Sequence, residues 1–185
     1  MTKGNIIFLN GTSSSGKTSL TRKLQEMLGE PYFHFSLDTF EDMAPKNHLK
    51  QDFWATLRMS VTGMHKSIAA FSESGLNVIV DHVILDIPEM EGWLDECVTH
   101  MHALPVLFVQ VNCPLVELER REKERGDRDI GQAKSQLEQI YGREIYDLEV
   151  NTYENSLEEC AQQIIDNLQI LDNNAFNRMY GGKAI

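Results

Sequence analysis

A glycine-rich stretch near the beginning of the sequence has the residue types needed to bind phosphate. Residues 11–18 read GTSSSGKT, which matches the pattern G-x-x-x-x-G-K-S/T. Glycine lets the backbone turn tightly, so that successive N–H groups and the N-terminus of a following helix can point at one anion. The pattern therefore predicts that Lys17 contacts the terminal phosphates of ATP and that the Thr18 hydroxyl ligates Mg²⁺. The predicted nucleotide-binding residues are Gly11, Thr12, Ser13, Ser14, Ser15, Gly16, Lys17, Thr18 and Ser19.

Two aspartates directly follow apolar runs that are typical of buried strands. Asp38 comes after residues 32–37, and Asp81 comes after Val-Ile-Val at residues 78–80. In an open α/β sheet, ligands bind at the carboxyl ends of the strands. The run before Asp81 is the pattern of a strand that ends in a magnesium ligand, so we expect Asp81 and Thr18 to bind the metal. The alternative for Asp81 is a plain turn residue at the end of a strand.

Asp38 is then the predicted general base. An enzyme that phosphorylates a hydroxyl group needs a side chain that accepts the hydroxyl proton, and Asp38 is the other acid at a predicted strand end. The alternative is a structural role, because residues 38–41, Asp-Thr-Phe-Glu, also have the pattern of a helix capping box.

The densest cationic segment lies between residues 120 and 128. It contains Arg120, Arg121 and the run Arg-Gly-Asp-Arg from Arg125 to Arg128. Guanidinium groups offer a fixed fork for phosphoryl oxygens, so Arg125 and Arg128 are predicted to act in catalysis from a lid of about residues 117–131. Glutamates alternate with these arginines, and a solvated helix face is the alternative. For Arg120 and Arg121 the sequence leaves both interpretations open.

These residues need a scaffold in which strands and helices alternate. Short apolar runs predict five strands, at residues 6–9, 32–37, 76–80, 106–111 and 148–152. Helical spacing of apolar residues predicts helices at 16–28, 53–71, 90–101, 133–141 and 156–171, and a further helix from Pro114. The alternation indicates an α/β fold with a parallel sheet between helices. Together with the pattern at residues 11–18, it predicts a P-loop NTPase three-layer sandwich. We expect one kinase domain over residues 1–172 and a polar, weakly ordered tail over residues 173–185.

Charge and composition argue against several other classes of protein. The 185 residues carry a formal net charge of −11, whereas proteins that bind polynucleotides usually present a basic surface. No apolar run reaches the ~20 residues of a membrane-spanning helix, and the three cysteines lack the spacing of a zinc site. We therefore expect a cytoplasmic protein that binds neither nucleic acid nor a membrane.

Together these motifs resemble the chloramphenicol phosphotransferase-like family. The resemblance covers about residues 5–168 and is carried by five stretches. These are the strand and loop at residues 6–18, Phe-Ser-Leu-Asp at 35–38, Val-Ile-Val-Asp-His at 78–82, Arg-Gly-Asp-Arg at 125–128 and Tyr-Asp-Leu-Glu-Val-Asn-Thr at 146–152.

The resemblance implies an ATP-dependent O-phosphotransferase with a shikimate-kinase-like fold. Members of the family phosphorylate a primary hydroxyl of chloramphenicol, with an acid at the position of Asp38 as base and with lid arginines at the positions of Arg125 and Arg128. The third strand of the family ends in two acids, whereas the second of these positions is His82 here. Residues 41–51 also differ from the family. Both differences concern the acceptor and leave the use of ATP intact.

The predicted function is therefore transfer of the γ-phosphate of ATP, with Mg²⁺, to a hydroxyl of a small molecule. The acceptor is either a chloramphenicol-like antibiotic or an unknown metabolite, and the predicted catalytic residues are Lys17, Asp38, Arg125 and Arg128. One alternative is a nucleoside monophosphate kinase or another metabolite kinase. An alternative from a different class is an NTP-binding regulatory module that acts on a protein partner. The sequence identifies neither the acceptor nor the oligomeric state.

Overall fold

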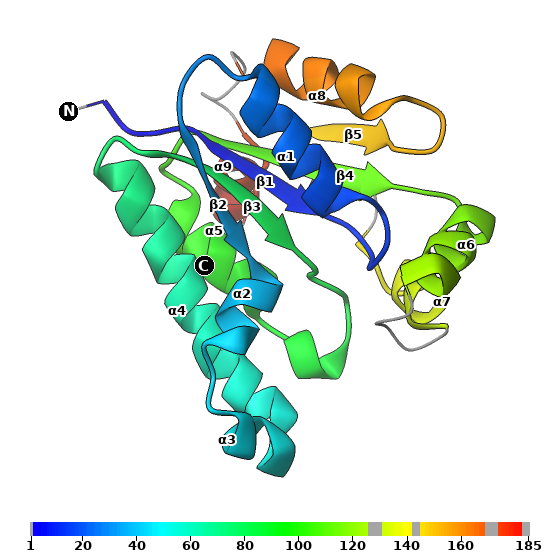
Figure 1. Cartoon of the computed structure of the whole chain (residues 1–185). Helices are drawn as coiled ribbons and strands as arrows, with labels where there is room; N and C mark the ends of the chain where they lie inside the picture. Colours follow the sequence, from blue (N-terminus) through cyan, green and yellow to red (C-terminus); the bar gives the residue numbers. More distant parts are fainter. Residues whose placement is uncertain (1, 126–130, 142–144, 169–173, 183–185) are drawn as a thin grey trace.

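A five-stranded parallel sheet with the strand order β2-β3-β1-β4-β5 forms the centre of the protein (Figure 1). The computed structural model describes residues 2–125, 131–141, 145–168 and 174–182. The strands are β1 (Ile6–Asn10), β2 (Tyr32–Ser36), β3 (Asn77–His82), β4 (Val106–Asn112) and β5 (Leu148–Asn151). This arrangement confirms the predicted fold class.

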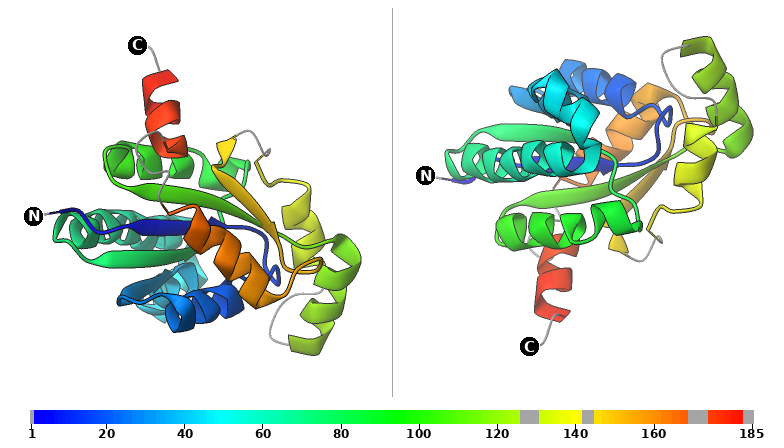
Figure 2. Two further views of the ribbon diagram at one scale, coloured as in Figure 1. Left: turned by 90° about the horizontal axis from the view of Figure 1, so that it is seen from above. Right: turned by 90° about the horizontal axis from the view of Figure 1, so that it is seen from below.

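Helices cover both faces of the sheet. One face carries α1 (Lys17–Met27) and α8 (Leu157–Asp166), and the other carries α4 (Phe53–Glu73), α5 (Trp93–Met101) and α9 (Ala175–Gly182) (Figures 1 and 2). The remaining elements are α2 (Leu37–Asp42), α3 (Lys46–Gln51), the 3-10 turn η1 (Pro88–Met90), α6 (Leu115–Arg125) and α7 (Gln132–Leu137). The strand arrowheads in Figure 1 point toward the side where α6 and α7 lie.

The central strand β1 shows why the sheet is covered on both faces. All five of its residues are buried, and their side chains alternate between two hydrophobic cores. Ile6 and Phe8 belong to the core beneath α4, α5 and α9, whereas Ile7 and Leu9 belong to the core beneath α1 and α8. A continuous apolar run is what a strand of a parallel sheet needs when helices pack on both sides.

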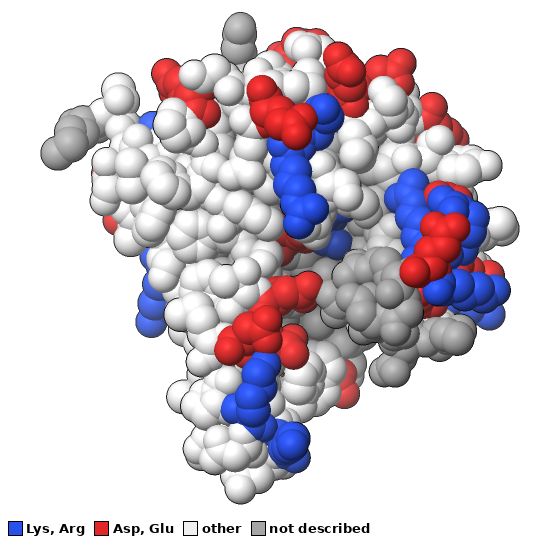
Figure 3. Space-filling model, in the orientation of Figure 1, with Lys and Arg blue, Asp and Glu red and all other residues white. Residues whose placement is uncertain are grey.

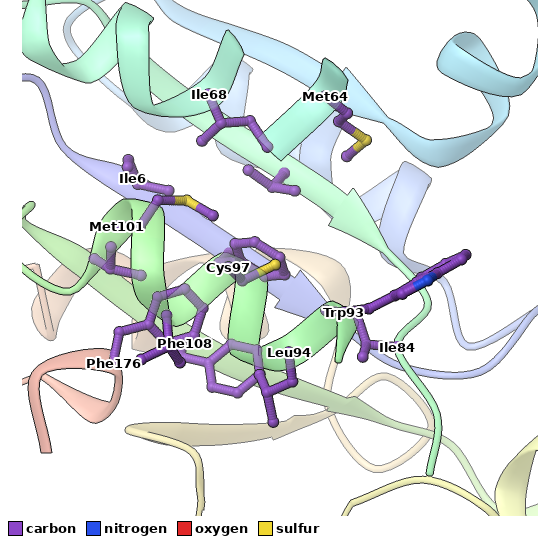
Figure 4. Close-up of a cluster of buried hydrophobic side chains, with 14 of the residues drawn as sticks. Ile6, Met64, Ile68, Ile84, Trp93, Leu94, Cys97, Met101, Phe108 and Phe176 are labelled. Carbon is purple, nitrogen blue, oxygen red and sulfur yellow. The ribbon is translucent and has the colours of Figure 1, made fainter. Parts of the chain in front are cut away.

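The larger core fills the space between α4, α5 and the sheet. In Figure 4, Met64 and Ile68 of α4 and Cys97 and Met101 of α5 point into this space, and all four side chains are fully buried. Burial of an aliphatic side chain of this size stabilises a fold by about 1.5–3 kcal/mol. The helically spaced apolar residues of the sequence are therefore the ones that pack into this core.

The region after β2 differs from the prediction. The strand ends at Ser36 rather than at residue 37, and α2 begins at once with Leu37. Ser36 is the N-cap of α2, because its Oγ accepts a hydrogen bond from the backbone N–H of Thr39 at 3.2 Å. The capping-box alternative for Asp38 is therefore wrong, since a serine two residues earlier already caps the helix.

The expected weakly ordered tail is also wrong for the part of it that the structure describes. Residues 175–182 form α9, and Phe176 is fully buried against Phe8 and Phe108, with ring centroids 5.5 Å and 4.9 Å away. The segment begins at Asn174, whose Oδ1 accepts a hydrogen bond from the N–H of Asn177. The buried ring of Phe176 thus anchors α9, although the polar composition of this segment had suggested a weakly ordered tail.

The helices and the surface charges of the structure also bear on membrane insertion and on binding to nucleic acid. Within the described ranges, no helix is both long enough and apolar enough to cross a membrane. On the face shown in Figure 3, basic side chains lie among acidic ones and form no continuous basic patch. Cys97, Cys113 and Cys160 are buried free thiols.

Candidate active site

The loop between β1 and α1 has the backbone geometry of a phosphate cradle. Gly16 has φ +96° and Ser14 has φ +61°, both in the left-handed region. A Cβ atom at Gly11 would lie 2.5 Å from the carbonyl oxygen of Val111, so only glycine allows the loop to pack against β4 at this point. No side chain caps the N-terminus of α1, so its first N–H groups and the positive end of the helix dipole are available to an anion.

Three predicted site residues meet at the edge of this loop. The Thr18 hydroxyl donates a hydrogen bond to Oδ2 of Asp81 at 2.6 Å, and the Lys17 ammonium lies 3.9 Å from Oδ1 of the same carboxylate. Lys17 also donates to the carbonyl oxygens of Gly11 and Thr12 at 3.0 Å and 2.8 Å. Asp81 and Lys17 are both buried, so their charges act in a region from which much of the water is excluded.

The donor set of this cluster fits Mg²⁺. That ion prefers oxygen ligands and is usually bound by one or two protein groups together with phosphates and water. The Thr18 hydroxyl and the Asp81 carboxylate supply such oxygens side by side. Among the described residues, no group of three or more His, Cys, Asp and Glu side chains could hold a metal by itself. The pair therefore suits a magnesium ion shared with a nucleotide rather than a closed metal centre.

One cavity of about 530 Å³ contains both the loop and Asp38. Its lining includes Ser13, Ser14, Gly16, Lys17, Thr18, Ser19, Ser36, Leu37, Asp38, Glu41, Phe53, Trp54, Leu57, Asp81, Val83, Met90, Arg121, Glu124, Gln132, Gln136, Thr152 and Leu157. Gly11, Thr12 and Ser15 are absent from this lining and lie buried beneath it. The structure therefore brings Asp38 to the phosphate-binding loop, although the two are far apart in the sequence.

Asp38 reaches the cavity from a helix rather than from a strand end. It is the second residue of α2 and is exposed, whereas Asp81 lies inside β3 and is 8% exposed. The register of the sheet aligns Ser36 of β2 with Asp81 of β3. Asp38 therefore lies just beyond the end of β2, two residues after the position that pairs with Asp81.

The structure distinguishes the two arginines for which the sequence left both interpretations open. Arg120 is an exposed helix-face residue that forms ion pairs with Glu117 and Glu124. Arg121 turns toward the phosphate-binding loop, where it donates to the carbonyl oxygen and the hydroxyl of Thr152 at 3.0 Å and to the carbonyl oxygen of Ser14 at 3.4 Å.

Thr152 completes this link, because its hydroxyl donates to the carbonyl oxygen of Ser15 at 2.6 Å. Arg121 and Thr152 therefore fasten α6 and the end of β5 to the loop. A Cβ atom at Gly16 would lie 3.3 Å from both side chains, which leaves little room for any other residue there.

The two predicted lid arginines lie outside this description. Arg125 is the last residue of α6, and its side chain is outside the described part of the structure. Arg128 falls within residues 126–130, which are likewise outside the described ranges. Their roles remain predictions from the sequence.

His82 lies behind the site rather than in it. It is fully buried, and its Nδ1 accepts a hydrogen bond from the N–H of Val83 at 2.8 Å. Since Nδ1 accepts, the ring proton is on Nε2, which lies 3.0 Å from Nε2 of His65. Burial lowers the pKa of His82 to about 3, so the ring is neutral at physiological pH.

Several cavity residues were not predicted from the sequence. Gln132 and Gln136 of α7 and the aromatic pair Phe53 and Trp54 of α4 belong to no recognisable motif. The Oε1 atom of Gln136 accepts a hydrogen bond from the backbone N–H of Ser13 at 2.6 Å. Only the folded structure brings these residues to the loop, since 123 positions of sequence separate Gln136 from Ser13.

The similarity of the chain to known proteins agrees with this geometry. The family model described as "Chloramphenicol phosphotransferase-like protein" matches residues 4–169. The chain belongs to this family. Proteins from two strains of Mycobacterium tuberculosis, each named "Putative O-phosphotransferase", are 28% identical to this family member over 204 residues, with 97% of this chain and 89% of each relative covered.

Solved kinase structures share the fold of this family member. A gluconokinase of Sinorhizobium meliloti has a TM-score of 0.67 at 18% identity and covers 98% of both chains. A shikimate kinase of Acinetobacter baumannii has a TM-score of 0.65 at 17% identity, over 93% of this chain and 96% of its own. The APS kinase of Mycobacterium tuberculosis has a TM-score of 0.64 at 18% identity, over 91% of this chain and 99% of its own. The likeness shows the P-loop kinase fold, as in shikimate kinase.

Proposed function

We propose that the protein is an ATP- and Mg²⁺-dependent O-phosphotransferase that transfers the γ-phosphate to a hydroxyl group of a small molecule. The observation that supports this most is that the phosphate-binding loop and Asp38 line the same cavity. The terminal phosphate of a donor and the hydroxyl of an acceptor can therefore lie side by side. Phosphoryl transfer depends mainly on such positioning and on electrostatic stabilisation.

In the proposed step, the acceptor oxygen forms a bond to the γ-phosphorus while the bond from that phosphorus to the β–γ bridging oxygen breaks. ADP leaves, and Asp38 accepts the proton of the acceptor hydroxyl. Lys17, with Arg125 and Arg128, offsets the negative charge of the phosphoryl oxygens. Mg²⁺, held by Thr18 and Asp81, would supply further neutralisation of the phosphate charge when bound.

The acceptor side of the cavity has an aromatic wall. Phe53 and Trp54 are 41% and 38% exposed, and their rings contact edge to face with centroids 5.3 Å apart. Leu57 and Met90 add apolar surface to the same lining. Partly exposed aromatic side chains in a cavity provide apolar contact area for a ligand.

The charges on this side are acidic. Asp38 and Glu41 line it, and the cavity residues that the structure describes include no lysine or arginine other than Lys17 and Arg121, which belong to the phosphate side. We therefore expect an acceptor without negative charge and with an apolar or aromatic body. Chloramphenicol has this character, whereas the phosphate of a nucleoside monophosphate would face two carboxylates.

The test is ADP release from Mg-ATP in the presence of hydroxyl-bearing candidates, chloramphenicol included. Asp38→Asn should lower acceptor-stimulated ADP release by a factor of about 100 or more, because a general base contributes roughly that much. ATP affinity should stay within about twofold. Asp42→Asn is the matched control, since Asp42 lies on the same helix and forms an exposed ion pair with Lys46. Full turnover by Asp38→Asn would contradict the assignment of the base.

A different result would contradict the whole proposal. If the protein bound Mg-ATP but no candidate stimulated ADP release, a regulatory NTP-binding module would explain the data better. A panel that combines uncharged aromatic alcohols with nucleoside monophosphates and sugar acids also tests the expected charge of the acceptor.

A further inference from the structure

The hydrogen bond between Gln136 and Ser13 joins α7 to a phosphate-binding group of the loop. The backbone N–H of Ser13 donates to Oε1 of Gln136 at 2.6 Å, and both residues line the cavity. An N–H group in this loop is a donor of the kind that binds a phosphate oxygen. Oε1 of Gln136 and a phosphate oxygen are therefore competing acceptors for one hydrogen atom.

The helix that carries Gln136 is held in place by a buried carboxylate. Glu122 of α6 is 1% exposed and accepts hydrogen bonds from the backbone N–H groups of Gly131 at 2.7 Å and Ala133 at 2.9 Å. Ala133 is fully buried and packs in a small apolar cluster with Leu118 of α6. The position of Gln136 is therefore fixed by the packing of α7 on α6, and it is not a loose surface side chain.

The same helix pair contacts the loop at a second point. Arg121 of α6 donates to the carbonyl oxygen of Ser14, the residue next to Ser13. Adjacent residues of the loop thus bond to α6 and to α7. The Ser13 N–H group is therefore in direct contact with α7.

We propose that Gln136 is a phosphate-positioning residue whose carboxamide changes partner when a nucleotide binds. A phosphate oxygen takes the Ser13 N–H group, because an anionic acceptor forms a stronger hydrogen bond than a neutral amide oxygen. The displaced Oε1 atom then lies beside negative charge. Rotation of the carboxamide replaces it with the Nε2 donor, which hydrogen-bonds the phosphate. This inference rests on the proposed nucleotide site and adds a residue that no motif assigns to it.

Two substitutions separate this role from a structural one. Gln136→Glu retains an acceptor for Ser13 but cannot donate and carries a charge that repels phosphate. It should weaken the binding of ATP and ADP by a factor of about ten or more, with adenosine unaffected. Gln136→Met retains the length without either hydrogen-bonding group. It should weaken ATP and ADP by about threefold to tenfold, because the donated bond to phosphate is lost.

The measurement is calorimetric titration of the full chain with ATP, ADP and adenosine in the presence of Mg²⁺. Gln162→Glu, the same change of charge at an exposed position of α8, is the control and should leave all three affinities unchanged. The order wild type, Gln136→Met, Gln136→Glu for phosphate-bearing ligands alone supports the inference.

Two results would overturn it while leaving the proposed function intact. The first is ATP affinity equal to wild type in both Gln136 variants. The second is an equal loss of affinity for adenosine and ATP, which would indicate that Gln136 only supports the fold. If one variant does not fold, the other decides between these outcomes. Failure of the wild-type chain to bind ATP would instead refute the nucleotide site itself.

Discussion

At the scale of single residues, Asp81 and Asp38 show how one functional group can have two different surroundings. Asp81 is 8% exposed and is fixed by the Thr18 hydroxyl and the Lys17 ammonium. Asp38 is exposed at the cavity wall, in the first turn of α2. A buried carboxylate beside a hydroxyl suits a metal site, whereas an exposed carboxylate in a cavity can meet an acceptor.

Thr18→Val tests the metal role at this scale. Valine has the shape of threonine without the hydroxyl, so the loop should keep its conformation. We expect the gain in ATP affinity that Mg²⁺ provides to fall by a factor of about ten, since a hydrogen bond or ligand to a charged group is worth ~1.5–3 kcal/mol. ATP titrations with Mg²⁺ and with a chelator measure this gain.

Thr99→Val is the matched control, because Thr99 is exposed on α5 and donates only to the carbonyl oxygen of Asp95. An unchanged effect of Mg²⁺ in Thr18→Val would argue against Thr18 as a ligand.

The residues of the site that the sequence could predict belong to one contiguous pattern or directly follow an apolar run. The loop at residues 11–18, Asp38 and Asp81 have this property. Arg121 and Gln136 do not, because their contacts with the loop depend on how α6 and α7 pack, which no local spacing encodes. Sequence reasoning therefore indicated the loop and the two aspartates, left the role of Arg121 open and missed Gln136.

At the scale of secondary-structure elements, the strands and long helices were predicted because each has a continuous or periodic apolar pattern. The short helices α2 and α3 were not predicted, because they contain six residues each and bury none of them fully. Their position comes from caps such as Ser36 and from contacts with α4. Composition likewise suggested a polar tail at the position of α9, whereas Ala175 and Phe176 of this helix are buried.

Phe176→Ala tests the contribution of α9. Removal of a fully buried aromatic side chain leaves a cavity between Phe8 and Phe108, and we expect the free energy of unfolding to fall by about 3–5 kcal/mol. Tyr180→Ala, on the same helix but 48% exposed, should cost about 1 kcal/mol or less. Urea unfolding measures both, and equal small losses would show that α9 does not belong to the core.

At the scale of the whole molecule, the buried histidines make stability depend on pH. Burial lowers the pKa of His82 to about 3, compared with an unfolded value near 6.5, and it also lowers the pKa of His65. Between these values the unfolded chain binds a proton that the folded chain does not bind. Stability should therefore be fully present above about pH 6.5 and should fall as the pH decreases toward 3.

His82→Asn removes one of these titrating groups while leaving an oxygen that can accept from Val83. The decrease in unfolding free energy from pH 6.5 to 4.5 should become less steep by up to ~1.4 kcal/mol per pH unit, which is the contribution of one proton. His48→Asn is the control, because His48 is exposed on α3. Identical slopes for wild type and His82→Asn, measured by urea unfolding, would contradict this account.

The central claim concerns the loop at residues 11–18 and the cavity that it shares with Asp38. Titration of the folded wild-type chain with ATP in the presence of Mg²⁺ tests it most directly. We predict saturable binding at one site per chain, which Lys17→Met weakens strongly. Absence of any binding heat at millimolar ATP, with the chain shown to be folded, would contradict the account.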